Sequence, residues 1–557
     1  MKYAIYSLPL WASILALLGG LPVLAQPLPD PRPGPNPLEP LPQLPPAPEA
    51  PVQLEEDIPP PVPLDPEAIP PISFFVDDIQ VVGNTIFEAE IEALVQPLEG
   101  REITLEDLLT LRTAITQLYV DNGYLTSGAF VPTNQDIDSR TAQIQVVEGQ
   151  IEQIQINGLG HLREGYVRDR ITRTTAPPLN VRRLEEGLQL LQVDPLLDSV
   201  NAELTAGSGP GQNILILDLA EADPFFVDFI VDNSRAPSIG TWQGGVLATH
   251  LNLLGFGDSL SLGYDFTEGL DLYEARYAVP LNGLDGSLQV RYENAESRII
   301  TPQFLDAGIR NENETFSLSF RQPLNRSLTN QFALGLGFDL RESRSFILND
   351  IPFSFSVGPE DGVARVSALR FFQEWVNRDT NTVLAARSQF NLGLGLFNAT
   401  VNDTGTDGRF FSWLGQFQWV EQFAPGTLLV TRVNAQLTPD SLLPLERFSV
   451  GGFDTVRGYA QNQVVTDNAV TASTELRVNI ASDLQLVPFL DAGGGWNNQT
   501  ENPPQGFLLG TGLGLRWQPT DAFSLRIDYG IPLISVRKDG TSLQENGLYF
   551  SVAVRPF

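Results

Sequence analysis

Two short motifs near the C-terminal end hold the residues best suited to a specific polar contact. They are Val456-Arg457-Gly458-Tyr459 and Phe489-Leu-Asp491-Ala-Gly493. A guanidinium presents a planar fork of donors and a carboxylate offers two acceptor oxygens, so Arg457 and Asp491 can form a bidentate bond. Gly458 allows a tight turn beside the arginine. Such a pair orients a loop more than it stabilises a fold, because desolvation offsets much of the attraction.

The composition excludes several other kinds of chemistry. The chain has 557 residues, no Cys, two His and a formal net charge of −33. Thiol catalysis, disulfides and zinc–thiolate sites all require Cys. An isoelectric point near 4.3 does not favour the basic face that nucleic-acid binding needs. We find no catalytic constellation, so we expect no enzymatic activity, no metal, no cofactor and no nucleic-acid partner.

The residues from 224 to 557 alternate between apolar and polar types with a period of two. One such segment sets Leu260, Leu262, Tyr264 and Phe266 against Ser259, Ser261, Gly263 and Asp265. The apolar face would be the core of a soluble sandwich, or the lipid-facing surface of a barrel whose polar face lines a wet lumen. About sixteen segments start near residues 225, 240, 258, 271, 286, 313, 330, 364, 381, 408, 426, 468, 484, 506, 522 and 546. An even number favours a closed antiparallel barrel.

Two smaller units precede this region, at residues 73–149 and 150–223. In the first, apolar residues recur at the spacing of an amphipathic helix, namely Ile91, Leu94, Val95 and Leu98. Thr104 with Asp107 resembles a capping box that opens a second helix, and Asn180 opens a helix in the second unit. We predict the order strand, helix, helix, strand, strand for both. A small sheet with a free edge suits the binding of extended chains.

The N-terminal part predicts export. Residues 1–25 combine Lys2, an apolar run and Val23-Leu24-Ala25, which is the pattern of a cleaved signal peptide. The alternative, a membrane anchor, is disfavoured because the run is shorter than the roughly 20 residues that a spanning helix needs. Residues 26–72 hold 19 of the 43 prolines, which predicts an extended spacer or, as an alternative, a proline-rich recognition segment.

The two motifs carry a family resemblance. Val456 to Tyr459 resembles the signature at the tip of the inward-folded loop of the POTRA-containing outer-membrane secretion and assembly superfamily. The motif from Phe489 to Gly493 is similar to its partner motif on the inner barrel wall. Two POTRA-like units before a sixteen-stranded barrel resemble the two-partner secretion branch, the transporters of haemolysins and filamentous adhesins, over residues 73–557. Residues 26–72 show no helical period for that family's plug helix, and Phe557 is out of phase with the last strand.

The resemblance implies a mainly β fold, a 16-stranded transmembrane β-barrel preceded by two small α/β POTRA-like domains. It also implies an outer-membrane transporter with POTRA domains in the periplasm. These domains would capture a large unfolded exported partner, adhesin-like or haemolysin-like, and the barrel would pass it to the cell surface. Two alternatives remain: a factor that assembles or inserts other barrels, and a passive porin. Porins need neither the periplasmic units nor the Arg457 and Asp491 pair.

Overall fold

The computed structural model describes residues 41, 54–56, 73–133, 135, 139–403, 405–537 and 541–556. The described residues divide into two compact units, one within residues 50–222 and one within residues 223–557. The predicted signal peptide, most of the proline-rich segment and Phe557 lie outside the described residues. The inferences about them therefore stay predictions.

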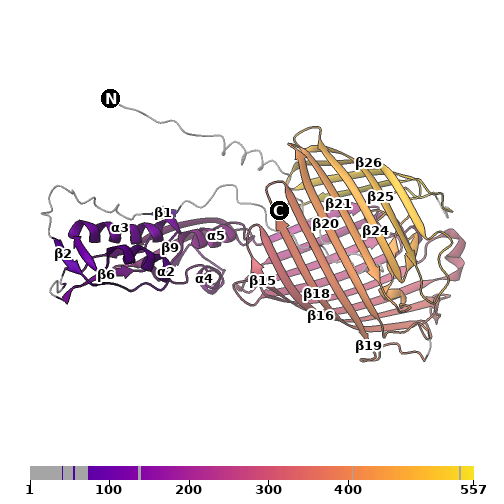
Figure 1. Cartoon of the computed structure of the whole chain (residues 1–557). Coiled ribbons are helices and arrows are strands. Elements are labelled where there is room, and N and C mark those ends of the chain that lie inside the picture. Colours follow the sequence, from indigo (N-terminus) through magenta and orange to yellow (C-terminus); the bar gives the residue numbers. More distant parts are fainter. Residues whose placement is uncertain are drawn as a thin grey trace. The chain divides into compact units, whose positions relative to one another are not determined.

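The first module of the smaller unit contains two helices and two small sheets (Figure 1). Its elements are β2 (Ser73–Val76), β3 (Asp78–Val82), α2 (Glu88–Val95), the 3-10 helix η2 (Gln96–Leu98), β4 (Arg101–Thr104), α3 (Leu105–Asp121), β5 (Gly128–Phe130) and β6 (Thr141–Val147). β6 pairs in parallel with β3 and antiparallel with β5, while β2 pairs with β4. β4 was not predicted, because four residues directly before a helix are too few to show a period of two.

The capping box predicted at the start of α3 is confirmed. The Thr104 hydroxyl accepts the Asp107 amide at 3.2 Å, and the Asp107 carboxylate accepts the Thr104 amide at 2.7 Å. The predicted helix faces are buried in one apolar core that includes Ile91, Val95, Leu108, Leu111, Ile115 and Ile144. This module therefore has a core of the ordinary soluble kind.

The second module contains β7 (Gln150–Asn157), α4 (Glu164–Thr172), α5 (Val181–Gln192), β8 (Leu197–Ala206) and β9 (Gln212–Glu221). The Asn180 side chain caps α5 by accepting the Arg183 amide at 3.3 Å. The sheet has the order β1-β8-β9-β7, and its outer strand β1 (Leu54–Glu56) comes from the proline-rich segment. β1 pairs in parallel with β8 from Ala202 to Leu204. A segment predicted as a spacer thus supplies a strand, because the edge of β8 offers free backbone donors and acceptors.

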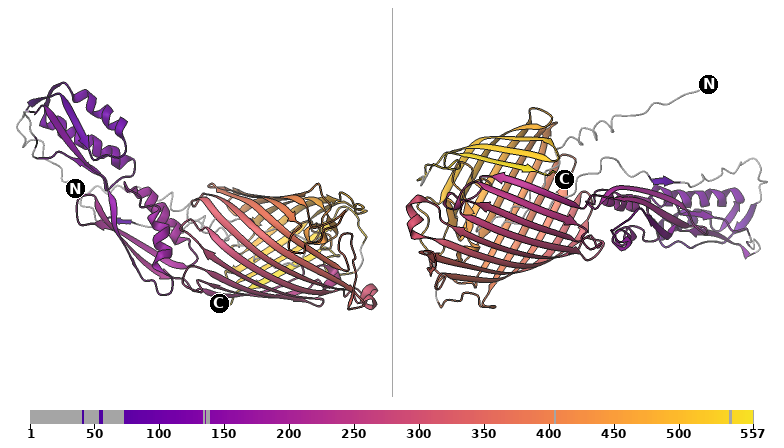
Figure 2. Two further views of the ribbon diagram at one scale, coloured as in Figure 1. Left: turned by 90° about the horizontal axis from the view of Figure 1, so that it is seen from below. Right: turned by 180° about the vertical axis from the view of Figure 1, so that it is seen from behind.

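The larger unit is a closed antiparallel barrel of sixteen long strands, which run obliquely around its axis (Figure 2). They are β10 (Phe225–Asp232), β11 (Gln243–Leu251), β12 (Ser259–Thr267), β13 (Leu270–Pro280), β14 (Ser287–Arg298), β15 (Arg310–Arg326), β16 (Asn330–Ile347), β18 (Val363–Arg378), β19 (Thr382–Leu394), β20 (Phe411–Ala424), β21 (Thr427–Leu437), β24 (Asn468–Asn479), β25 (Leu484–Trp496), β26 (Phe507–Thr520), β27 (Phe523–Pro532) and β28 (Leu548–Val554). β10 pairs with β28 to close the ring, and the short β17 (Ile351–Pro352) adds to the end of β16. The predicted barrel is confirmed, and each strand begins within three residues of its predicted start.

The two faces of the wall have opposite character. On β12, Leu262 and Phe266 point outward and are 52% and 46% exposed, whereas Asp265 points inward and is 2% exposed. An apolar exterior around a polar interior is the pattern of a barrel in lipid and the reverse of a sandwich core. No helix in the described part of the chain is long and apolar enough to cross a membrane. Connecting loops contain the 3-10 helices η4 (Pro237–Ile239) and η5 (Pro302–Ala307).

Candidate functional site

The connection from β21 to β24, residues 438–467, folds into the barrel and is called the inner loop below. It contains the 3-10 helix η6 (Pro444–Glu446) and a hairpin of β22 (Phe448–Val450) and β23 (Val464–Thr466). No strand was predicted to start between the two near residues 426 and 468. The hairpin was missed because three-residue strands are too short to show a period. Its apolar side chains are buried with residues of the inner wall, in a cluster of Leu414, Phe448, Val450, Val456, Tyr459, Val464, Ala469 and Leu508.

Arg457, at the tip of the inner loop, forms the bidentate bond with Asp491 that the two residue types make possible. Its Nε donates to Asp491 Oδ2 at 2.7 Å, and its Nη2 donates to Asp491 Oδ1 at 2.9 Å. The Arg457 amide adds a third bond to the same carboxylate at 3.1 Å. Arg457 is 2% exposed and Asp491 1% exposed, so the contact is fully inside the protein.

Two further carboxylates bind the same guanidinium, and neither was among the predicted site residues. Arg457 Nη1 donates to Glu475 on β24 at 2.8 Å and lies 3.3 Å from Asp528 on β27. Each carboxylate also has an arginine of the wall, since Glu475 pairs with Arg477 and Asp528 with Arg516. Their inward phase on a strand of period two was the signal available in the sequence. The tip is therefore held by three strands rather than one.

Phe489 contributes its ring face to this contact. The Arg457 guanidinium lies 3.5 Å from the ring centroid, a cation–π arrangement. Phe453, also in the inner loop, contacts the ring of Tyr549 instead, and the guanidinium of Arg526 lies over the Phe453 ring.

Gly458 and Tyr459 tie the tip to the last strands. Gly458 has φ +101°, and a Cβ there would lie 2.9 Å from the backbone nitrogen of Pro532, so both conformation and space require glycine. Its amide donates to the Tyr549 hydroxyl at 2.8 Å, and that hydroxyl donates to the Tyr459 carbonyl at 2.6 Å. The Tyr459 hydroxyl is bonded to the carbonyl of Leu509 at 2.8 Å. Tyr549 was missed by the sequence analysis because it lies far from both motifs.

Glycines form the part of the wall on which the tip rests. A Cβ on Gly493 would lie 2.7 Å from Val450 Cγ1, and one on Gly510 would lie 2.0 Å from the Arg457 carbonyl oxygen. A Cβ on Gly530 would lie 2.4 Å from the Gly458 nitrogen. Gly493, predicted as a motif residue, therefore permits close approach of the loop. Gly510 and Gly530 do the same and were not singled out.

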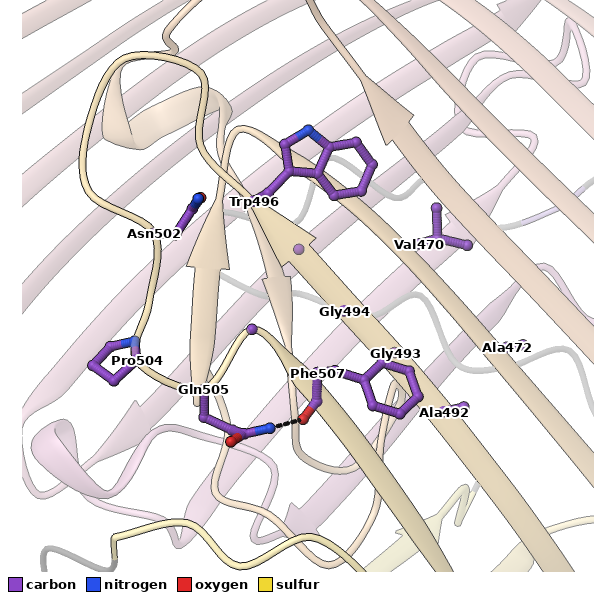
Figure 3. Close-up of a pocket in the computed structure, with 12 residues that line it drawn as sticks. Val470, Ala472, Ala492, Gly493, Gly494, Trp496, Asn502, Pro504, Gln505 and Phe507 are labelled. Atoms are coloured by element: carbon purple, nitrogen blue, oxygen red, sulfur yellow. Dashed lines mark hydrogen bonds between the residues drawn. The ribbon is translucent and has the colours of Figure 1, made fainter.

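A shallow groove of about 700 Å³ lies on the other side of this wall (Figure 3). Its lining includes Val470, Trp496 and Phe507, which are 40%, 44% and 49% exposed on the outward face. The groove and the docked loop share Gly493, whose backbone also lines the groove. In the described part of the chain, no group of three or more His, Asp or Glu is arranged to hold a metal ion.

Comparisons with known proteins agree with this arrangement. The pattern of the haemolysin secretion/activation proteins ShlB/FhaC/HecB matches residues 211–517, and that of the ShlB-type POTRA domain matches residues 74–149. The outer membrane transporter CdiB of Escherichia coli O6:K15:H31 is 25% identical over 86% of this chain and 82% of its own. The heme/hemopexin transporter protein HuxB of Haemophilus influenzae is 22% identical over 83% of this chain and 84% of its own.

The fold also resembles a solved structure. CdiB from Escherichia coli superposes with a TM-score of 0.68 at 20% identity, covering 99% of this chain and 100% of that one. The matched family pattern spans more than half of the chain. The protein is thus an outer-membrane transporter for a secreted partner protein, with its POTRA region in the periplasm. The chain belongs to the haemolysin secretion/activation family ShlB/FhaC/HecB.

Proposed function

We propose that the inner loop is the gate of the transporter and that Arg457 and Asp491 hold it closed. The observation that carries this proposal is the buried contact of the loop tip with three strands of the inner wall. A polypeptide that crosses the lumen must pass the loop. The docked state then sets the resting position, and release of the tip opens the route.

The two modules at residues 73–149 and 150–223 bind the partner as an extended chain. Edge strands accept further strands through backbone hydrogen bonds, which needs little sequence specificity. The pairing of β1 with the edge of β8 supports this role, because it demonstrates that this edge can hold an extended segment. The match of the ShlB-type POTRA pattern to residues 74–149 supports it for the first module.

The partner is a large secreted protein of the haemolysin or adhesin kind, delivered unfolded. A lumen lined by charged and polar groups suits this cargo, since it gives an unfolded chain few apolar surfaces on which to stick. The chain itself performs no catalysis in this scheme, and folding of the partner outside the cell supplies the driving force. A partner that cannot fold but is still secreted at the normal rate would contradict that last step.

The Arg457→Ala variant tests the gate. The partner is first identified as the protein lost from the culture medium, by mass spectrometry, when this chain is absent. We expect Arg457→Ala to lower its secretion at least a hundredfold, because three carboxylates lose their common partner and the tip loses its position. The folded barrel, measured by its heat-modifiable mobility on gels, should remain at the normal amount. Normal secretion by this variant would refute the gate.

Deletion of residues 73–149 tests the capture step. We expect secretion of the partner to stop while other outer-membrane barrels still assemble at their normal levels. A general loss of outer-membrane barrels would instead identify an assembly factor. The two outcomes are distinguished by quantifying both the medium and the outer-membrane fraction.

A further inference from the structure

The inner loop has a second charged contact at its base. Glu446 ends η6 and is 2% exposed. Its carboxylate accepts two bonds from Arg370 Nη2, at 2.9 and 3.1 Å, and one from Arg341 Nη1 at 2.9 Å. Arg341 lies on β16 and Arg370 on β18, so this carboxylate bridges two neighbouring strands of the wall.

Other groups fix the same point. Arg370 also donates to Asp339 on β16, and Arg341 also donates to the Leu445 carbonyl. Gln436 on β21 donates to the Glu446 carbonyl at 2.9 Å. Beside these bonds, Leu442 and Leu443 of the loop are buried against inward side chains of β18, namely Ala364, Val366 and Ala368. A charged contact and an apolar contact therefore coincide at the base, as they do at the tip.

The two attachment regions lie on different parts of the wall. The charged contacts of the base are made with β16 and β18, whereas those of the tip are made with β24, β25 and β27. Strands β19, β20 and β21 separate β18 from β24 in the ring. Because the wall of a closed barrel curves between these strands, the inner loop crosses the lumen as a chord that is held at both ends.

We propose that Glu446 is a positioning residue for the gate. It fixes the base of the inner loop so that Arg457 reaches Asp491, and the chord stays in the lumen only while both ends are held. The inference rests on the proposed function for its role in transport, but the position of the loop can be measured without any partner protein. Arg370 acts on the inner loop through Glu446, and Arg341 acts through Glu446 and the Leu445 carbonyl. Neither arginine is bonded to Arg457 among the described contacts.

The chain contains no Cys, which permits a direct measurement of loop position. Val450 is fully buried against the wall, so a Val450→Cys variant reports when the hairpin leaves it. The purified full-length variant in detergent is labelled with a maleimide reagent. We expect slow labelling in this background and labelling at least tenfold faster once Glu446→Gln is added. Arg457→Ala in the same background gives the rate for a released tip.

Glu342→Gln is the matched control. Glu342 also lies on β16 and is held between two arginines, Arg344 and Arg365, but it is bonded to no residue of the inner loop among the described contacts. Its replacement should leave the labelling rate within twofold. Ion conductance in planar bilayers with potassium chloride gives a second measurement, and Glu446→Gln should open the pore at least five times more often than Glu342→Gln.

The labelling results test the role of Glu446 in placing the loop, whereas the secretion assay of Arg457→Ala tests the gate. Slow labelling of position 450 in folded Glu446→Gln would overturn it, because the tip would then be placed without Glu446. Fast labelling with unchanged conductance would also overturn it. If Glu446→Gln does not yield folded barrel, Arg341→Gln keeps the bonds of Arg370 to Glu446 and should speed labelling at least threefold. An unchanged rate in that variant would overturn the inference as well.

Discussion

The POTRA unit and the barrel unit bury opposite kinds of residue. In helix α3, Leu111 is 3% exposed within an apolar core, and polar residues face water. In strand β12, Leu262 is 52% exposed on the outer surface, while Asp265 is 2% exposed inside. Both follow the same rule, which places apolar groups away from water. The difference shows that the surrounding solvent decides which face of an element becomes the interior.

The inside of the barrel is not simply a second surface, however. Near the inner loop it is packed tightly, with glycines under the tip and buried carboxylates around Arg457. Away from the loop, some inward polar side chains, such as Ser261 on β12, are only partly buried. We therefore expect substitutions near the inner loop to disturb the structure more than substitutions elsewhere on the inner wall.

The largest expected effect comes from placing the same charge in both interiors. Leu111→Asp should destabilise the first module by more than about 4 kcal/mol, because an unpaired charge enters an apolar core. Ser261→Asp, on the lumen face opposite Arg276 in β13, should change barrel stability by less than about 1 kcal/mol. Limited proteolysis of the full chain reports the first change and heat-modifiable mobility the second. Equal sensitivity of the two sites would break the comparison.

An intermediate effect is expected from added volume inside the barrel. Gly510→Ala puts a methyl group against the Arg457 carbonyl and should weaken docking of the tip by about 1–3 kcal/mol. Gly263→Ala is the control, since its Cβ would lie 3.6 Å from Glu274 Cβ, an ordinary contact. Labelling of the Val450→Cys background should accelerate in the first variant alone. Similar rates in both would show that the tip does not rest on Gly510.

The smallest effect concerns a carboxylate of the POTRA unit. Glu148 accepts bonds from the Thr85 amide at 2.7 Å, the Thr85 hydroxyl at 2.6 Å and the Tyr119 hydroxyl at 2.7 Å. Partial burial raises the pKa of Glu148, but these bonds outweigh it and hold the pKa below its usual value of 4.5. Glu148→Gln should lower the stability of the module by about 1–2 kcal/mol at neutral pH.

The pH dependence of this effect has a definite sign. A depressed pKa stabilises the fold above the unfolded value, and that contribution is lost as pH falls through the folded pKa. The difference between wild type and Glu148→Gln should therefore be full at pH 7 and shrink below about pH 4.5. Hydrogen exchange of α3 and β6 in the full chain measures it. A difference that grows on acidification would contradict this assignment.

Period-two alternation was sufficient to predict the barrel strands and the direction of their side chains. It placed Leu262 outside and Asp265 inside, and it located all sixteen strand starts to within three residues. Helix periodicity and capping predicted α2, α3 and α5 in the same way. The short elements β4, β22 and β23 were not predictable, because three or four residues cannot display a period and tertiary contacts hold them in place.

The sequence likewise pointed to some residues of the candidate site and not to others. Arg457, Gly458, Asp491 and Gly493 could be selected because they stand in motifs with distinctive residue types. The inward phase of Glu475 and Asp528 could be read from their strands, but their contact with Arg457 could not. Nothing in the sequence marked Tyr549 or Glu446, since each is an ordinary residue of its strand or loop until the barrel closes.

The sequence by itself determined the alternation of apolar and polar residues in the strands and the helix caps. It also supplied the Arg457 guanidinium and the Asp491 carboxylate that can form a bidentate bond. These depend on residue type and local spacing, which are covalent properties. Only the tertiary structure decided which wall the inner loop touches, where it is held a second time and which glycines admit it. Closure of the ring brings Glu446 to Arg370, 76 residues away, and Arg457 to Asp528, 71 residues away. Contacts at such separations depend on how the wall curves, and the local spacing of residues does not predict that curvature.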